Sequence, residues 1–159
     1  MNSPIKDWEF LRQNDEYSCG RQCAYMVTSF FGMKSQRRKL RALLKTTKNG
    51  TYQANIANAI KIYSREVSEI PLNISITSFS NSDIWSRSAI EEFLKERFEK
   101  GYIAIACVDN GSHWIVTRAI RGKRVYIADP DSNQKYIALT TFLNRVILGS
   151  VVLVRNPNN

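Results

Sequence analysis

Hydrophobic residues in the first part of the chain recur at helical spacing. Within residues 18–31 apolar side chains fall on one side at intervals of three and four, which predicts a helix, and Gly32 can end it. Residues 35–46 repeat the pattern, with a serine at the first position able to cap that helix. A turn at Asn49-Gly50 then precedes a third predicted helix, for which Thr51 is a candidate cap.

The pattern changes in the second half of the chain, where apolar and polar residues alternate or form short apolar runs. Alternation and short runs bounded by turn residues are typical of strands. We expect strands at 72–77, 102–108, 113–120, 125–129 and 150–155, and helices at 88–99 and 140–146. Helices first and hairpin-linked strands afterwards predict an α+β fold with a mostly antiparallel sheet. Without a linker or repeat, residues 1–159 are expected to form one domain.

The charge of the chain is concentrated in one segment. The sequence has 23 Lys and Arg against 14 Asp and Glu, a formal net charge of +9, and 43% hydrophobic residues, which excludes a disordered basic tail. No acidic residue occurs between Glu16 and Glu66, whereas ten basic residues do, and the rest of the chain is nearly neutral. Such a segment can attract nucleic acid, anionic lipid or an acidic protein, or it can simply form a solvated helical face.

Several functional classes are excluded by what the sequence contains. No apolar run approaches the roughly 20 residues that span a bilayer, and residues 1–13 lack the apolar core of a secretory signal. Three cysteines without such a signal argue against a disulfide framework. A single histidine excludes a His-rich metal site. We therefore expect a cytoplasmic protein with no membrane partner, no metal and no cofactor.

The single histidine and one of the cysteines lie where catalytic chemistry is favoured. His113 opens a predicted strand directly after a turn, which places it at the rim of the sheet. Cys19 lies at the start of the first helix, where free N–H groups and the helix dipole lower the pKa of a thiol. A nearby imidazolium lowers it further. Cys23 and Cys107 lie in apolar elements, as expected of ordinary buried thiols.

Two further residues complete a candidate site. Asp129 ends the strand after the His113 strand, and a hairpin between them would bring its carboxylate close enough to accept the imidazole Nδ1–H. Taken alone, an Asp-Pro pair at a strand end is more often an ordinary turn. Gln13, six residues before Cys19, supplies an amide that could form an oxyanion hole together with the Cys19 backbone N–H.

These residues, in this order, resemble a known family. Gln13 six residues before Cys19-Gly20 at a helix start, then Gly111-Ser112-His113-Trp114 on a strand, then Ala128-Asp129-Pro130, is similar to the bacteriocin-processing, double-glycine leader peptidases. The resemblance covers about residues 12–153. It implies a papain-like fold, with the N-terminal helices packed on the antiparallel sheet, and a cysteine endopeptidase that cleaves a protein substrate at a Gly-Gly-like site.

The resemblance implies roles for individual residues. Cys19 would be the nucleophile, His113 the general base and acid, Asp129 the orienting residue and Gln13 the oxyanion donor. Substrate contacts are expected from residues that flank the nucleophile and the histidine, namely Gly20, Arg21, Ser112 and Trp114. Arg21 departs from the small residue or proline usual in the family, which would alter the groove beside the nucleophile.

No transmembrane or nucleotide-binding region follows, so we expect a stand-alone domain rather than an exporter. Such basic papain-like domains are similar to toxin effectors that a secretion system delivers into a target cell. The basic segment would then attract an acidic substrate surface or an acidic inhibitor or immunity protein.

Other functions remain open at this stage. The same site could carry out transglutamination or deamidation, since an amine can resolve an acyl-enzyme as water does. The basic segment could bind nucleic acid, although it has few aromatic residues for stacking and no recognised nucleic-acid-binding motif, so that partner is not expected. An inactive adaptor is disfavoured because all four candidate site residues are present.

Overall fold

The computed structural model describes residues 9–158; residues 1–8 and 159 lie outside the description, and with them most of the N-terminal segment in which no secretory signal is expected. The helices are α1 (Cys19–Phe30), α2 (Arg37–Leu44), α3 (Gln53–Val67), α4 (Arg87–Glu99) and α5 (Leu139–Val146). The strands are β1 (Asn73–Ser78), β2 (Ile103–Val108), β3 (His113–Arg121), β4 (Arg124–Ala128), β5 (Tyr136–Ala138) and β6 (Ser150–Arg155).

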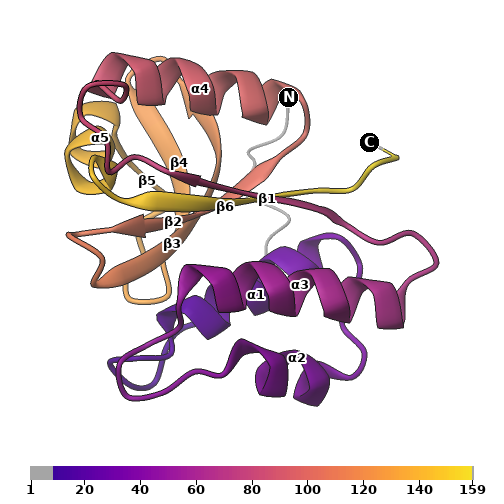
Figure 1. Cartoon of the computed structure of the whole chain (residues 1–159). Coiled ribbons are helices and arrows are strands. Elements are labelled where there is room, and N and C mark those ends of the chain that lie inside the picture. The colour runs from indigo at the N-terminus through magenta and orange to yellow at the C-terminus, as the bar shows by residue number, and fades with distance from the viewer. Residues whose placement is uncertain (1–8, 159) are drawn as a thin grey trace.

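The six strands form one antiparallel sheet in the order β1-β6-β2-β3-β4-β5. Figure 1 shows α1, α2 and α3 on one face of this sheet and α4 and α5 on the other. The α+β class with N-terminal helices on a mostly antiparallel sheet is therefore confirmed. The two expected hairpins, β2–β3 and β3–β4, are also confirmed.

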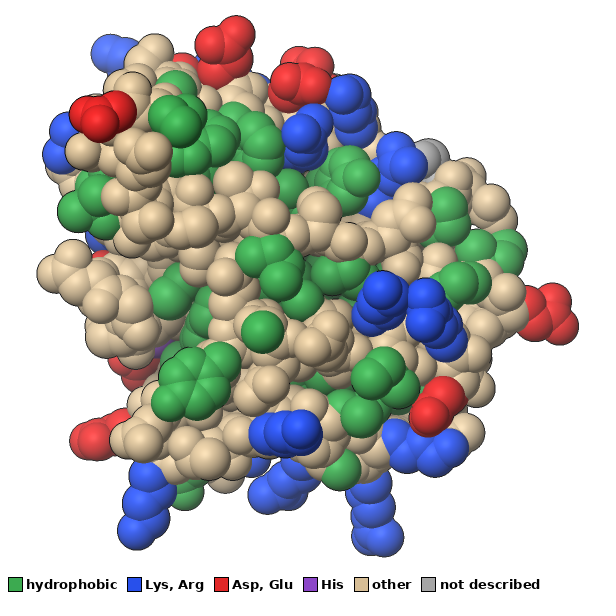
Figure 2. Space-filling view, viewed as in Figure 1, with side chains coloured by type: hydrophobic (Ala, Val, Ile, Leu, Met, Phe, Trp, Pro, Cys, Tyr) green, Lys and Arg blue, Asp and Glu red, His purple; other side chains and the backbone are tan. Residues whose placement is uncertain are grey.

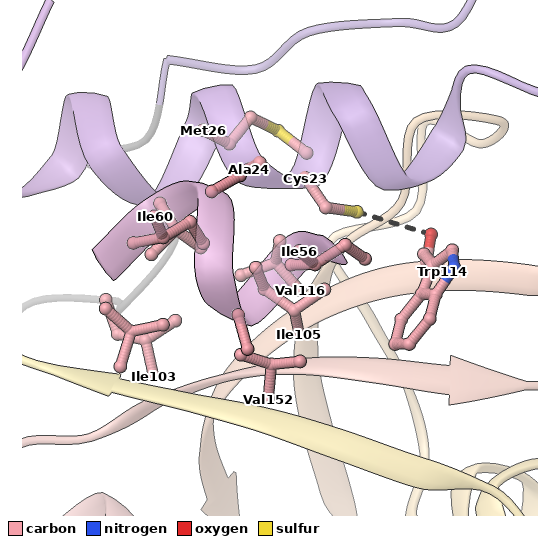
Figure 3. Close-up of a cluster of buried hydrophobic side chains, with 14 of the residues drawn as sticks. Cys23, Ala24, Met26, Ile56, Ile60, Ile103, Ile105, Trp114, Val116 and Val152 are labelled. Carbon is pink, nitrogen blue, oxygen red and sulfur yellow. Dashed lines mark hydrogen bonds between the residues drawn. The ribbon is translucent and has the colours of Figure 1, made fainter. Parts of the chain in front are cut away.

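Each face of the sheet has its own hydrophobic core. Alternate residues of β2 point to opposite faces, so that Ile103 and Ile105 pack against the α1–α3 layer and Ala104 and Ala106 against α4 and α5. Figure 3 shows the first of these cores, where Ile56 and other apolar side chains of α1 and α3 meet the sheet. Because β2 is covered on both faces, all six of its residues are buried. The β3 strand that begins with His113 thus pairs with a strand that is buried along its whole length.

Two expected helix caps are wrong. The second helix begins at Arg37 after a left-handed Gln36, so Ser35 does not cap it. The third begins after Tyr52, and the Thr51 hydroxyl bonds to that of Thr46 at 2.7 Å instead of to the helix. Thr51 is drawn inward because its backbone carbonyl accepts a hydrogen bond from the Trp114 indole at 3.0 Å. Tertiary contacts across the site thereby override the local capping preference.

The basic segment forms the outer side of the helical layer. Figure 2 shows Lys and Arg side chains projecting from the lower part of the molecule, where α2 and α3 lie in the same view of Figure 1. Some are paired: Arg37 bonds to Glu9 at 2.8 Å and Lys39 lies 3.5 Å from Glu66. Within residues 9–158 no helix is long and apolar enough to cross a membrane.

Candidate active site

Cys19 is the first residue of α1 and lies against β3. The thiol of Cys23, one helical turn later, donates to the Trp114 carbonyl at 3.4 Å, while the Trp114 backbone N–H lies in hydrogen-bond contact with the Cys19 sulfur. Figure 3 shows the Cys23–Trp114 contact that ties α1 to this strand. The start of a helix and the start of a strand, far apart in sequence, are thus fastened together. Cys19 lies at that junction with 4% of its surface exposed.

His113 lies between Cys19 and Asp129. Its Nε2 is 2.6 Å from Asp129 Oδ1, and it also forms a hydrogen bond with the Cys19 sulfur. The β3–β4 register explains this contact, because Ala128 pairs with Val116 and the following Asp129 then falls beside the beginning of β3. The expected Asp129 contact therefore exists, but through Nε2 rather than Nδ1. Asp129 is itself held by the Asp131 backbone N–H, which donates to Oδ1 at 2.9 Å.

The electrostatics favour a thiolate–imidazolium pair. Burial acts to raise the pKa of the Cys19 thiol, but hydrogen bonds from His113 and from the Trp114 and Gly20 backbone lower it below its usual value. Burial likewise opposes charge on His113, yet the hydrogen bonds with Asp129 and Cys19 raise its pKa to about 10. The pKa of Asp129 is lowered despite its burial, because His113 and the Asp131 N–H stabilise its charge. At neutral pH the proton is thus favoured on the imidazole.

The other two cysteines differ from Cys19. Complete burial raises the pKa of Cys23 well above its usual value, and burial raises that of Cys107 to about 11. All three cysteines are free thiols. Only Cys19 has the lowered pKa that makes a thiol nucleophilic near neutral pH.

Gln13 lies in the loop before α1, beside the end of β4. Its backbone N–H donates to the Pro130 carbonyl at 2.9 Å, which fixes the loop next to Asp129. Its side-chain Nε2 donates to the Asp15 carbonyl at 2.8 Å, and its buried Oε1 has no hydrogen-bond partner. The amide is therefore oriented by its own loop and borders the same cleft as His113 and Asp129.

One cleft, of about 400 Å³, lies on the Cys19 side of the site. Its walls include Cys19 and Trp114, the turn at Asn49 and Gly50, and Tyr52. Gly20 lies just behind this wall, where a Cβ atom would come within 3.0 Å of Thr51 Cβ and 3.1 Å of Trp114 Cδ1. The absence of a side chain at Gly20 therefore lets α1, the Thr51 segment and β3 approach closely.

A second cleft, of about 850 Å³, lies on the His113 side. Ser112 borders both clefts, so they meet at the candidate catalytic residues. The second cleft is acidic: its lining includes five carboxylates and one arginine. These are Asp15, Glu16, Asp109, Asp129, Asp131 and Arg145. The side chains that line this cleft thus carry a net negative charge, although the net charge of the whole chain is positive.

Three of the four expected substrate-contact residues lie at the first cleft or just behind its wall. Ser112 and Trp114 line it directly, and Gly20 permits its close packing. Arg21 differs, since its side chain is 13% exposed, lies 3.9 Å from Asp15 and lines neither of the two clefts. Its side chain thus lies beside the loop that carries Gln13, and its contact with substrate stays a prediction.

Other lining residues could not be found from sequence. Asn49-Gly50 predicts a turn, but nothing in the sequence indicates that Lys48 and Gly50 line a cleft. Cys107 and Ser150 come to the cleft only because β6 inserts beside β2 and pairs these two residues. Such long-range strand pairing leaves no mark in local periodicity.

Replacement of Gly20 by alanine is expected to destabilise the protein by about 1–2 kcal/mol, because the new methyl group would lie 3.0 Å from Thr51 and 3.1 Å from Trp114, closer than an ordinary contact, in a packed wall. It should also lower catalytic efficiency, because both neighbours border Cys19. Urea unfolding and peptidase rates measure the two effects. Gly122→Ala is the control: it has no atom within 4 Å but a φ of +58°, so it should lower stability alone. Equal effects of the two variants on the rate would contradict this view of the wall.

A buried thiol at a helix start, paired with a histidine at the rim of an antiparallel sheet, is the arrangement of a papain-like cysteine peptidase. The comparisons with known proteins agree. The chain belongs to the Peptidase C39 family, whose sequence profile matches residues 7–159. It is accordingly a cysteine protease, a hydrolase that acts on peptide bonds.

Solved structures show the same fold at low sequence identity. A double glycine motif protease from an AMS/PCAT transporter, in complex with its leader peptide, is 18% identical, with a TM-score of 0.71, and the match covers 93% of this chain and 91% of that one. The peptidase domain of Streptococcus ComA is 18% identical, with a TM-score of 0.63 and coverages of 92% and 97%. A C39-like peptidase from Bacillus anthracis is 14% identical, with a TM-score of 0.67 and coverages of 97% and 95%. No curated protein matches the chain.

Proposed function

We propose that this peptidase cleaves a peptide or protein after a pair of small residues, with glycine preferred, through an acyl-enzyme on Cys19. The observation that carries the proposal is the position of His113, which is hydrogen-bonded to Cys19 and to the buried carboxylate of Asp129. This arrangement supports a preformed thiolate nucleophile, because each contact stabilises one charge of the Cys19–His113 pair.

In the proposed reaction, the Cys19 thiolate attacks the scissile carbonyl carbon and the carbonyl oxygen becomes an oxyanion. The Cys19 backbone N–H and the Gln13 side-chain amide would donate to that oxygen. His113 then gives its proton to the leaving amine, and Asp129 keeps the imidazole oriented during the transfer. Water, deprotonated by His113, attacks the thioester carbonyl carbon; the C–S bond breaks, the acyl product leaves as a carboxylic acid, and the Cys19 thiolate and His113 imidazolium are restored.

The preference for glycine is supported by the wall of the smaller cleft. Gly20, Thr51 and Trp114 pack closely into a wall beside Cys19, and glycine before the scissile bond would let the substrate backbone lie against this wall. A structural neighbour is named as a double glycine motif protease. Because the neighbour is only 18% identical, its preference enters here as a proposal that the cleft supports.

A set of matched peptides tests the preference. Peptides with Gly-Gly, Gly-Ala, Ala-Gly and Gly-Val before the cleavage point are incubated with the enzyme and analysed by mass spectrometry. Gly-Gly should be cut fastest, Ala immediately before the bond should reduce kcat/KM by about tenfold or more, and Val should abolish cleavage, since each clash costs at least 1–3 kcal/mol. Equal rates for Gly-Gly and Gly-Val would refute the preference. An intact peptide with an altered mass would indicate acyl transfer or deamidation instead of hydrolysis.

The exposed basic residues of α2 and α3 support a further part of the proposal, an acidic protein partner. Arg38, Arg41 and Lys61 are exposed on this layer, and such a surface steers acidic proteins by long-range attraction. We propose that an inhibitor or immunity protein binds there and that the peptidase acts as a toxin effector. Growth of bacteria that express wild type or Cys19→Ala is the measurement. Equal growth of both strains would count against the effector role.

A further inference from the structure

The turn between β2 and β3, which leads directly into His113, has an unusual backbone. Asp109 and Asn110 have φ values of 57° and 58°, and Gly111 has 85°, so three consecutive residues are left-handed. Residues other than glycine adopt this conformation at a cost, and it persists where other contacts enforce it. Ser112 closes the turn, because its N–H and its hydroxyl both donate to the Asp109 carbonyl, at 3.3 and 2.7 Å. The Asp109 carbonyl thus anchors the turn.

Arg145, in the last turn of α5, forms three hydrogen bonds with Asp109. Its Nε donates to Asp109 Oδ1 at 2.8 Å and a terminal nitrogen donates to Oδ2 at 2.9 Å, a bidentate pair. The Asp109 backbone N–H in turn donates to the Arg145 carbonyl at 2.9 Å. Side chain and backbone of one residue are therefore bound to side chain and backbone of the other.

The end of α5 is suited to this contact. The Arg145 carbonyl is among the last of the helix, which leaves it without a partner inside α5, and the Asp109 N–H supplies one. Just after the helix, Gly149 passes so close to β2 that any side chain there would overlap the Cys107 carbonyl oxygen. Helix end and strand end are thus packed together immediately before the turn. Only the remaining turn residues separate this contact from His113.

We propose that Arg145 is a positioning residue for the peptidase reaction: by clamping Asp109 it fixes the β2–β3 turn and so sets the distance between His113 and Cys19. The inference rests on the proposed roles of His113 and Cys19. It assigns to α5, on the opposite face of the sheet from α1 (Figure 1), a part in aligning the two reacting groups. A displacement of about 1 Å in such a pair can cost about 100-fold in rate.

If Arg145 and Asp109 acted on His113 only through their charges, the loss of Arg145 would have the opposite effect from the one that positioning predicts. The charged groups around His113 are Cys19 from α1, Asp129 after β4, Asp109 in the turn and Arg145 from α5, with Asp15, Glu16 and Asp131 on the same cleft. By charge alone, loss of Arg145 would stabilise the imidazolium, and loss of the Asp109 carboxylate would destabilise it. Positioning predicts instead that both losses impair the Cys19–His113 pair in the same direction.

The test compares Arg145→Gln, Asp109→Asn and the double variant with wild type. Asparagine tolerates the left-handed backbone, so Asp109→Asn keeps the turn while removing the carboxylate. Arg145→Lys is the conservative variant, which keeps the charge without the bidentate geometry. The control is Arg87→Gln, since Arg87 also contacts α5, at Asn144 Oδ1 (2.6 Å), but touches nothing in the turn. Circular dichroism identifies a temperature at which every variant is folded.

Two readouts are used, the rate of Cys19 alkylation by iodoacetamide between pH 5 and 10 and the kinetics of peptide cleavage. Arg145→Gln and Asp109→Asn should each slow alkylation at pH 6 by about tenfold and lower kcat more than they raise KM. The double variant should be no slower than either single variant, because one clamp is lost in all three. Arg145→Lys should lie between, and Arg87→Gln should match wild type.

Opposite effects of Arg145→Gln and Asp109→Asn on alkylation would overturn positioning and leave charge as the cause. Single variants that behave like Arg87→Gln would overturn it as well. If wild-type Cys19 itself reacts at pH 6 no faster than an ordinary thiol, the thiolate pair does not exist. The proposed function then fails, and the inference fails with it. If wild type reacts rapidly and the variants do too, only the inference fails.

Discussion

Replacement of Cys19 by alanine is expected to lower kcat for peptide cleavage by at least about 10⁴-fold, to a rate set by substrate binding and any oxyanion contacts alone. Cys19 is the only one of the three thiols with a lowered pKa, and it borders a cleft, so no other thiol can take over as nucleophile. The fold should survive, because the change removes one small, buried atom at a helix start and leaves the Cys23–Trp114 contact in place.

Cys107→Ala is the matched control for this experiment. Its thiol borders the same cleft, but burial raises its pKa to about 11, so it is not expected to ionise near neutral pH. Its loss should leave kcat within a few-fold of wild type. Cleavage of the Gly-Gly peptide by the two variants, together with mass spectrometry of the alkylated wild type, checks both expectations. Activity retained by Cys19→Ala and lost by Cys107→Ala would show that the nucleophile has been assigned to the wrong cysteine.

Local patterns predict the helices and strands of this chain well, because amphipathic spacing acts within one element. The helices at 18–31 and 88–99 and the hairpin around Gly122 lie where periodicity indicates. The sequence pattern does not predict strand β5, since three residues after a polar turn are too few for a periodicity. The insertion of β6 between β1 and β2 was also beyond local reasoning, because its partners lie far away in sequence.

The sequence predicts those residues of the candidate site whose type and position within an element point to catalysis. A cysteine at a helix start, a lone histidine after a turn and an aspartate at the end of the next strand are visible in the sequence, and the structure brings all three together. The ring nitrogen that meets Asp129 and the anchoring of Gln13 at Pro130 depend on tertiary packing. So does the position of Arg21, whose side chain lies 3.9 Å from Asp15 and lines neither of the two clefts.

The structure places most of the positive charge of the chain away from the cleft beside His113. The net charge of +9 belongs mainly to the outer side of α2 and α3, whereas the cleft beside His113 is lined by five carboxylates. A partner guided by the basic helices would therefore bind on a different surface from the residues that enter this cleft. Of these carboxylates, Asp129 contacts His113 and favours a protonated imidazole, which couples the local charge to the chemistry of the site.

Asp129→Asn is expected to lower kcat by about 10²-fold and to narrow the pH range of activity. An asparagine carbonyl can still accept the hydrogen bond from Nε2, so the ring stays oriented, but the negative charge that stabilises the imidazolium is lost. The pKa of His113, raised to about 10 in wild type, should fall, and that of Cys19 should rise. Because the ion pair exists only between these two pKa values, both limits of the profile move inward.

The measurement is kcat/KM from pH 5 to 11, which reports the ionisations of the free enzyme. The acidic limit should shift to higher pH because the thiolate forms less readily, and the alkaline limit should shift to lower pH because the imidazolium loses its proton earlier. Asp131→Asn is the control: its side chain lies on the same cleft, but only its backbone N–H contacts Asp129, so its limits should stay those of wild type. An Asp129→Asn enzyme with unshifted limits would mean that the carboxylate only orients the ring. The charge of the thiolate alone would then hold the proton on His113.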